Sequence, residues 1–189
     1  MGPALAILEI RSIARGYLAL DAMAKRAVVS VHRAEPISPG KYWIAVSGGE
    51  AEIEEALDAG VAVAGDARLD HTLLPYAHEA VLRAVVEGSR PAPPDGSMGV
   101  LEFDGLASAI RAADAAMKCA SVTLVDLHLA RGIGGKGYLV ISGDLSDVEA
   151  ALDAGAEVGG AEHIAGREVL PNPDAAVPEA AARRGSARG

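Results

Sequence analysis

The apolar residues of this chain form short continuous runs, and these runs alternate with stripes in which apolar residues recur every three or four positions. After the first run, Ile13, Tyr17, Leu20 and Ala24 recur three or four residues apart, which predicts an amphipathic helix with Ser12 as its N-cap. The elements predicted for the first half are strands at 4–10, 28–33, 42–46 and 69–74, and helices starting at residue 13 and covering 52–63 and 76–87.

The second half of the chain repeats the first. The recurring segments are Leu8-Glu9-Ile10 as Leu101-Glu102-Phe103, residues 13–27 as 106–120, Gly40-Lys41 as Gly135-Lys136, and Ala56–Gly60 unchanged as Ala151–Gly155. Each copy has the order strand, helix, strand, strand, helix, strand, with a glycine-rich turn between the middle strands. The fold class predicted is therefore α+β: two tandem ferredoxin-like βαββαβ domains, mainly antiparallel, with helices on one sheet face.

The domain boundaries follow from local composition. Pro, Gly and Ser dominate residues 88–97, which predicts a linker between a first domain at 1–87 and a second at 98–173. Beyond Pro173 the chain is mostly Ala, Arg and Gly with little to bury, so we expect a disordered tail at 174–189.

Composition and charge exclude several partners. The formal net charge of −9 disfavours nucleic acid and anionic membranes, both of which would repel the protein. Charges interrupt every apolar stretch well before the roughly 20 residues of a membrane span. With Cys119 as the single cysteine and no basic-then-apolar leader, a reducing cytoplasm is the expected compartment.

No motif indicates an enzyme. Residues 132–137 satisfy G-x-G-x-x-G, but they lead into a predicted strand, whereas a dinucleotide site needs the helix N-terminus that holds the pyrophosphate. The five histidines lack metal-ligand spacing, and Cys119 is predicted to be a small core residue within a helix. Glu9 and Glu102 recur at matching positions, but a single carboxylate at a strand end is more often structural than catalytic. We expect neither a catalytic site nor a metal site.

Two lysines recur near the end of the first helix of each copy. Asp21 precedes Lys25 by four residues, and Asp114 precedes Lys118 by the same spacing. Each lysine could simply form an intrahelical ion pair near a helix C-terminus. Alternatively, both lysines could lie on the edge of an oligomer. The spacing alone favours the first interpretation.

Taken together, these residues resemble the tandem-domain shell proteins of bacterial microcompartments. The matching motifs, which span nearly all of residues 4–173, are LEI-x-S-x-A-x-G at 8–16, DAM-x-K-x-A at 21–27, DAA-x-K at 114–118, SPGK at 38–41, GIGGKGY at 132–138 and SGDLSDVEAALDAG at 142–155. The resemblance implies that three chains form a flat pseudohexamer around a central pore. It also implies that Lys25 and Lys118 are the edge lysines through which neighbouring tiles pack.

The resemblance assigns the pore to the two glycine-rich turns. Its lining would consist of Ser38, Pro39, Gly40, Ile133, Gly134, Gly135 and Lys136. Glycine allows the close approach that a shared opening requires, and the Ser38 hydroxyl can partly replace water around a polar solute. Lys41 and Lys136 could bias the pore towards anions or point into the surrounding protein, and the alternation of side chains along a strand does not distinguish the two.

The pattern is also similar to the propanediol-utilisation type of tandem shell protein, which holds an iron–sulfur cluster through a cysteine in the first turn. Ser38 stands where that type has its cysteine. Because thiolates are the usual ligands of such clusters, we expect no cofactor here.

We therefore expect a non-enzymatic structural tile of a microcompartment shell in the cytoplasm. As a homotrimer it would pack edge to edge with other shell proteins and admit small polar metabolites through its pore. The alternative is a duplicated α+β regulatory protein whose glycine-rich turns bind a small anion between the two copies.

Overall fold

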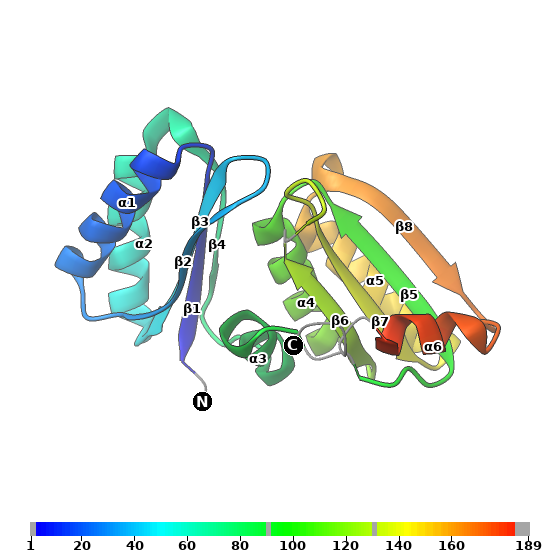
Figure 1. Ribbon diagram of the computed structural model, residues 1–189. Coiled ribbons are helices and arrows are strands. Elements are labelled where there is room, and N and C mark those ends of the chain that lie inside the picture. The colour runs from blue at the N-terminus through cyan, green and yellow to red at the C-terminus, as the bar shows by residue number, and fades with distance from the viewer. Residues whose placement is uncertain (1–2, 90–91, 130–131, 184–189) are drawn as a thin grey trace. The chain divides into compact units, whose positions relative to one another are not determined.

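The computed structural model describes residues 3–89, 92–129 and 132–183, which form two compact units (Figure 1). Of the described residues, the first unit contains 3–86 and 132–135, and the second contains 87–89, 92–129 and 136–183. In the first unit the elements are β1 (Ala4–Ile10), α1 (Ile13–Arg26), β2 (Ser30–Ile37), β3 (Lys41–Gly48), α2 (Glu50–Ala64), β4 (Arg68–Leu74) and α3 (Glu79–Glu87), whose last residue belongs to the second unit. In the second they are β5 (Ser97–Phe103), α4 (Leu106–Cys119), β6 (Thr123–Leu129), β7 (Gly137–Gly143), α5 (Leu145–Gly159), β8 (Ile164–Leu170) and α6 (Ala176–Arg183).

The first unit is a four-stranded antiparallel sheet in the order β2-β3-β1-β4, with α1 and α2 packed on one face. Side chains of β1 alternate between the two faces, so Leu8 and Ile10 join Met23 of α1 and Ile53 of α2 in a common core. The apolar runs in the sequence therefore correspond to central strands of a sheet.

The second unit repeats this arrangement in the order β6-β7-β5-β8, with α4 and α5 on one face. Glycines allow close contact between helix and sheet: a Cβ atom on Gly159 would lie 2.4 Å from the ring of Phe103. The predicted α+β class and the duplication are both confirmed.

The first helix of the structure has a different buried face from the one that its spacing suggests. Gly16, Ala19 and Met23 are the buried residues of α1, whereas Ile13 and Tyr17 are exposed. The predicted period is correct, but part of the apolar stripe faces away from the core of its own unit. The cap is as predicted, because the backbone N–H of Arg15 donates to the Ser12 hydroxyl at 3.3 Å.

The predicted disorder of the tail is wrong for residues 176–183, which form α6. Ala181 packs against the second sheet at a cluster that includes Met98, Val125 and Val140. This contact explains the helix, because it buries apolar surface that the composition alone does not reveal. Residues 184–189 lie outside the described part of the chain.

Residues of the predicted linker form hydrogen bonds with strand β6. The Ser89 hydroxyl donates to Asp126 at 2.5 Å and accepts the Leu127 N–H at 3.0 Å. Further along, the Ala92 N–H donates to the Val125 carbonyl at 2.9 Å. Residues of the linker therefore continue along the edge of the second sheet.

Candidate functional site

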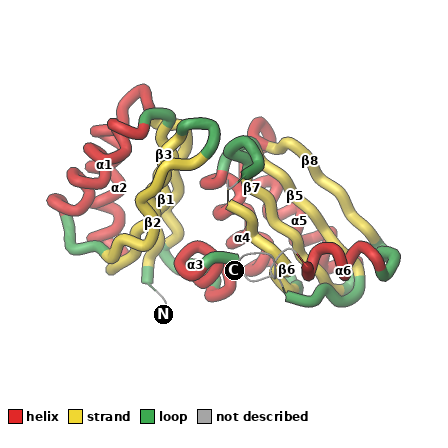
Figure 2. The backbone as a smooth tube through the Cα atoms, viewed as in Figure 1, coloured by secondary structure: helices red, strands yellow, loops and turns green. Residues whose placement is uncertain are grey.

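The first predicted turn closes the hairpin between β2 and β3 (Figure 2, green). Ile37 pairs with Lys41, which leaves Ser38, Pro39 and Gly40 as an exposed three-residue loop. The Gly40 N–H donates to the Ile37 carbonyl at 2.9 Å, and its φ of +97° is a conformation that favours glycine. The loop offers one hydroxyl and its backbone groups to whatever it faces.

The second turn joins β6 to β7 and is described from Gly132 onward. Gly132, Gly134 and Gly135 have φ values of +72°, +69° and +83°, which explains the density of glycine in this turn. Residues 130–135 group with the first unit, and a Cβ on Gly135 would lie 2.6 Å from the Ser38 carbonyl oxygen. The structure therefore brings these two predicted segments together, and the approach requires a glycine.

The lysine after each turn is bonded to a strand glutamate. Lys41 Nζ donates to Glu9 Oε1 at 2.8 Å, and Lys136 Nζ donates to Glu102 Oε1 at 2.7 Å. The sequence shows that both glutamates and both lysines recur but not that they meet, because the contact depends on the register of the strands. Both lysines are thus directed towards their own sheets.

The predicted edge lysines lie at the opposite end of each unit from the turn. Because α1 starts just after the strand end beside the turn and has 14 residues, its last turn lies about 20 Å further along. Lys25 donates to Asp21 at 2.7 Å, and Lys118 donates to Asp114 at 2.5 Å. Lys25 remains 76% exposed and Lys118 43% exposed, so both ammonium groups stay accessible.

Cys119 is exposed at the end of α4, so its prediction as a core residue is wrong. Cys119 is the last residue of the helix, and its Sγ donates to the Ala150 carbonyl of α5 at 3.7 Å without being buried. Among residues 3–89, 92–129 and 132–183 no group of three or more His, Cys, Asp or Glu side chains could hold a metal ion. Within the same ranges no helix has the length and apolar character to cross a bilayer.

Two side chains of the first unit have shifted pKa values. Burial, helped by the charge of Arg33, lowers the pKa of His32, whose Nε2 lies 2.6 Å from the Ser47 hydroxyl. Burial raises the pKa of Tyr42, as does the neighbouring Tyr17, whose ring centroid lies 5.1 Å away.

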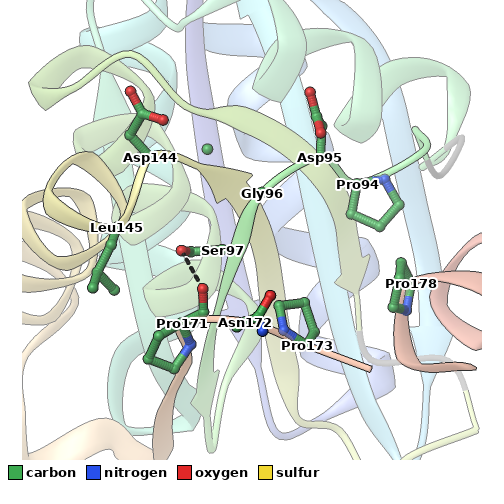
Figure 3. Close-up of a pocket in the computed structure, with 11 residues that line it drawn as sticks. Pro94, Asp95, Gly96, Ser97, Asp144, Leu145, Pro171, Asn172, Pro173 and Pro178 are labelled. Atoms are coloured by element: carbon green, nitrogen blue, oxygen red, sulfur yellow. Dashed lines mark hydrogen bonds between the residues drawn. The ribbon is translucent and has the colours of Figure 1, made fainter. Parts of the chain in front are cut away.

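A separate pocket of about 350 Å³ lies at the end of the second sheet remote from the turn (Figure 3). Asp95 and Asp144 lie on one side of it, and the segment 171–173 lies on the other. The Ser97 hydroxyl donates to the Pro171 carbonyl at 2.8 Å. Its polar groups do not converge on one point, and the pocket does not include the predicted pore residues.

Equivalent surfaces of the two units are unequally buried. On α1, Ile13 is 39% exposed and Tyr17 61% exposed, whereas the matching residues of α4, Leu106 and Ile110, are fully buried. On the sheet face opposite the helices, the first unit is the more buried of the two. Ile7 and Trp43 of the first unit are buried. The matching residues of the second unit, Val100 and Tyr138, are only partly buried. The repeat alone did not predict this difference.

Comparisons with known proteins place both halves of the chain in one family. The family model "BMC domain" matches residues 4–77 and 97–173. The chain is 39% identical to the bacterial microcompartment shell protein PduT of Citrobacter freundii, over 92% of this chain and 94% of that protein.

Among solved structures, a microcompartment protein from Desulfitobacterium hafniense has a TM-score of 0.80 at 33% identity, over 95% of this chain and 99% of that one. A fused permuted hexameric shell protein of the RMM microcompartment has a TM-score of 0.62 at 23% identity, over 82% and 80% of the two chains, and shares the fold.

Proposed function

Because this chain belongs to the BMC-domain family of bacterial microcompartment shell proteins, we propose that it forms a trimeric shell tile with a central pore for small polar metabolites. It is a structural component of a microcompartment shell and not an enzyme. The alternative of a regulatory ligand-binding protein is not favoured by these relatives.

The unequal burial of the two units carries the trimer proposal. The first unit exposes the apolar residues Ile13 and Tyr17 of α1, and the second exposes part of the sheet face around Val100 and Tyr138. Contiguous exposed apolar residues mark association sites. Since the two surfaces differ and both belong to one chain, contact between copies would be head to tail, which closes into a ring when the rotation allows. Three chains with two domains each would fill six positions.

The placement of the turns and the lysines supports a pore at the centre and contacts at the perimeter. Within each unit the turn lies at one end of the sheet, and the edge lysine lies at the other end of the first helix. If the turns converge on the axis of a ring, Lys25 and Lys118 face outward. There they would contact neighbouring tiles and other shell proteins.

In such a ring the pore would be lined by Ser38–Gly40 and Ile133–Lys136 from every chain. These residues supply backbone N–H and carbonyl groups and one hydroxyl, a suitable lining for a polar solute that loses part of its water. Serine at position 38 provides no thiolate, so we expect neither an iron–sulfur cluster nor another cofactor.

Oligomer mass tests this proposal. A trimer measured by light scattering, which forms sheets at higher concentration by electron microscopy, supports the tile. A monomer or dimer that binds a small anion saturably would instead support the regulatory protein.

A further inference from the structure

The two ion pairs beside the turns occupy the same register position in both units. Glu9 lies opposite Trp43, and Glu102 lies opposite Tyr138. In each case the lysine is two residues before the glutamate's partner, so it is a diagonal neighbour on the same face, within reach of a long side chain. The pairing is therefore built into the hairpin of each repeat, because the strands place the two charges together.

Burial makes the first pair obligatory, whereas the second pair is accessible in a single chain. Glu9 is only 1% exposed, and a carboxylate that is buried so deeply requires a cationic partner. In the second unit of a single chain Lys136 is 47% exposed and Glu102 35% exposed, and the sheet face that carries them is one of the two surfaces proposed to meet in the ring. Glu102 can therefore be changed with less risk to folding than Glu9.

We propose that Glu9 and Glu102 set the charge of the pore by pairing with the lysine beside each turn, so that these lysines do not select for anions. This inference rests on the proposed pore. Unpaired, the two lysines of each chain would add six positive charges near the opening of a trimer and would attract anions. Paired, they contribute no net charge, and the lining favours neutral polar solutes.

The experiment compares the full-length wild type with Glu102→Gln and Lys136→Gln. Tiles are reconstituted across a planar bilayer, and the reversal potential is measured in a KCl gradient at about 0.15 M mean salt. Glu149→Gln, on an exposed part of α5, removes the same charge away from the turn and is the matched control. The charge of Arg131, which lies outside the described residues, is common to all four proteins and cancels in the comparison.

Glu102→Gln should raise the chloride-to-potassium permeability ratio about twofold, as expected for three charges about 10 Å from the ion path in screened water. Lys136→Gln should shift the ratio in the opposite direction, since it leaves the carboxylate unpaired. Glu149→Gln should match the wild type. Acylation of Lys136 by a small water-soluble reagent, measured on chains diluted until the trimer dissociates and read by peptide mass spectrometry, should be at least twofold faster in Glu102→Gln.

The outcomes separate the two levels of the proposal. Unchanged selectivity in a conducting Glu102→Gln tile, despite faster acylation of Lys136, overturns the role of the glutamates but leaves the pore. Unchanged acylation overturns the pairing itself. Wild-type trimers that do not conduct overturn the pore and, with it, this inference.

Discussion

The exposed residues of α1 provide the sharpest test of the ring. The double variant Ile13→Ala/Tyr17→Ala removes apolar surface that the chain leaves 39% and 61% exposed, while alanine keeps the helix propensity. Complete burial of such side chains contributes about 1.5–3 kcal/mol each, so the exposed fractions would contribute about 2.5 kcal/mol at each contact between copies. Over three contacts this is about 7 kcal/mol, or roughly five orders of magnitude in the association constant.

The assay is multi-angle light scattering over a concentration series. The wild type should have a mass of about 58 kDa, three times the 19.2 kDa chain, and the double variant should be a monomer at micromolar concentration. The matched control is Leu145→Ala/Val158→Ala, which removes two residues of α5 that are 38% and 50% exposed and should leave the trimer intact. If the α1 double variant stays trimeric, as the control variant should, then this surface does not belong to the ring.

Four further predictions concern separate parts of the molecule. Gly137→Ala should lower the free energy of unfolding by about 1–3 kcal/mol in a denaturant titration, because its Cβ would lie 2.6 Å from that of Ala109. Lys25→Ala with Lys118→Ala should preserve the trimer but abolish sheets in electron micrographs; sheets that persist would contradict the edge role. Because the pKa of His32 in the folded protein lies below its ordinary value of 6.5, the unfolded state binds protons more readily there, and stability should fall on acidification below about pH 6.5. His32→Gln should show a shallower loss in the same titration. Protein purified without oxygen should contain no iron and no visible absorbance, and stoichiometric iron would contradict the expected absence of a cluster.

The sequence predicted the fold well because the duplication shows the apolar pattern of each strand and helix twice. Boundaries moved by a few residues; the second strand of the first unit, for example, was predicted at 28–33 and is Ser30–Ile37. The spacing on α1 gave the period of the helix but not what each apolar residue contacts, and Ile13 and Tyr17 are exposed. The same limit applies to Cys119, which is exposed as the last residue of α4.

The predicted turn residues lie in turns, and the predicted edge lysines are exposed, but the pairing of Glu9 and Glu102 with the lysines was not foreseen. Recurrence identified all four residues, whereas the contact depends on the register between strands that are far apart in the sequence. The sequence could therefore suggest a charged opening, and the neutralising partners became visible only with the hairpins in place.

The linker between the two domains, which hydrogen-bonds to β6, has a consequence for solubility. Strand β6 lies at the border of its sheet, where unsatisfied amide and carbonyl groups could recruit a strand from another molecule and start aggregation. The bonds from Ala92 to Val125 and from Leu127 to Ser89 occupy two of these groups. The peptide that fuses the duplicated halves thus also shields a sheet border, a protection that separately encoded halves would lack.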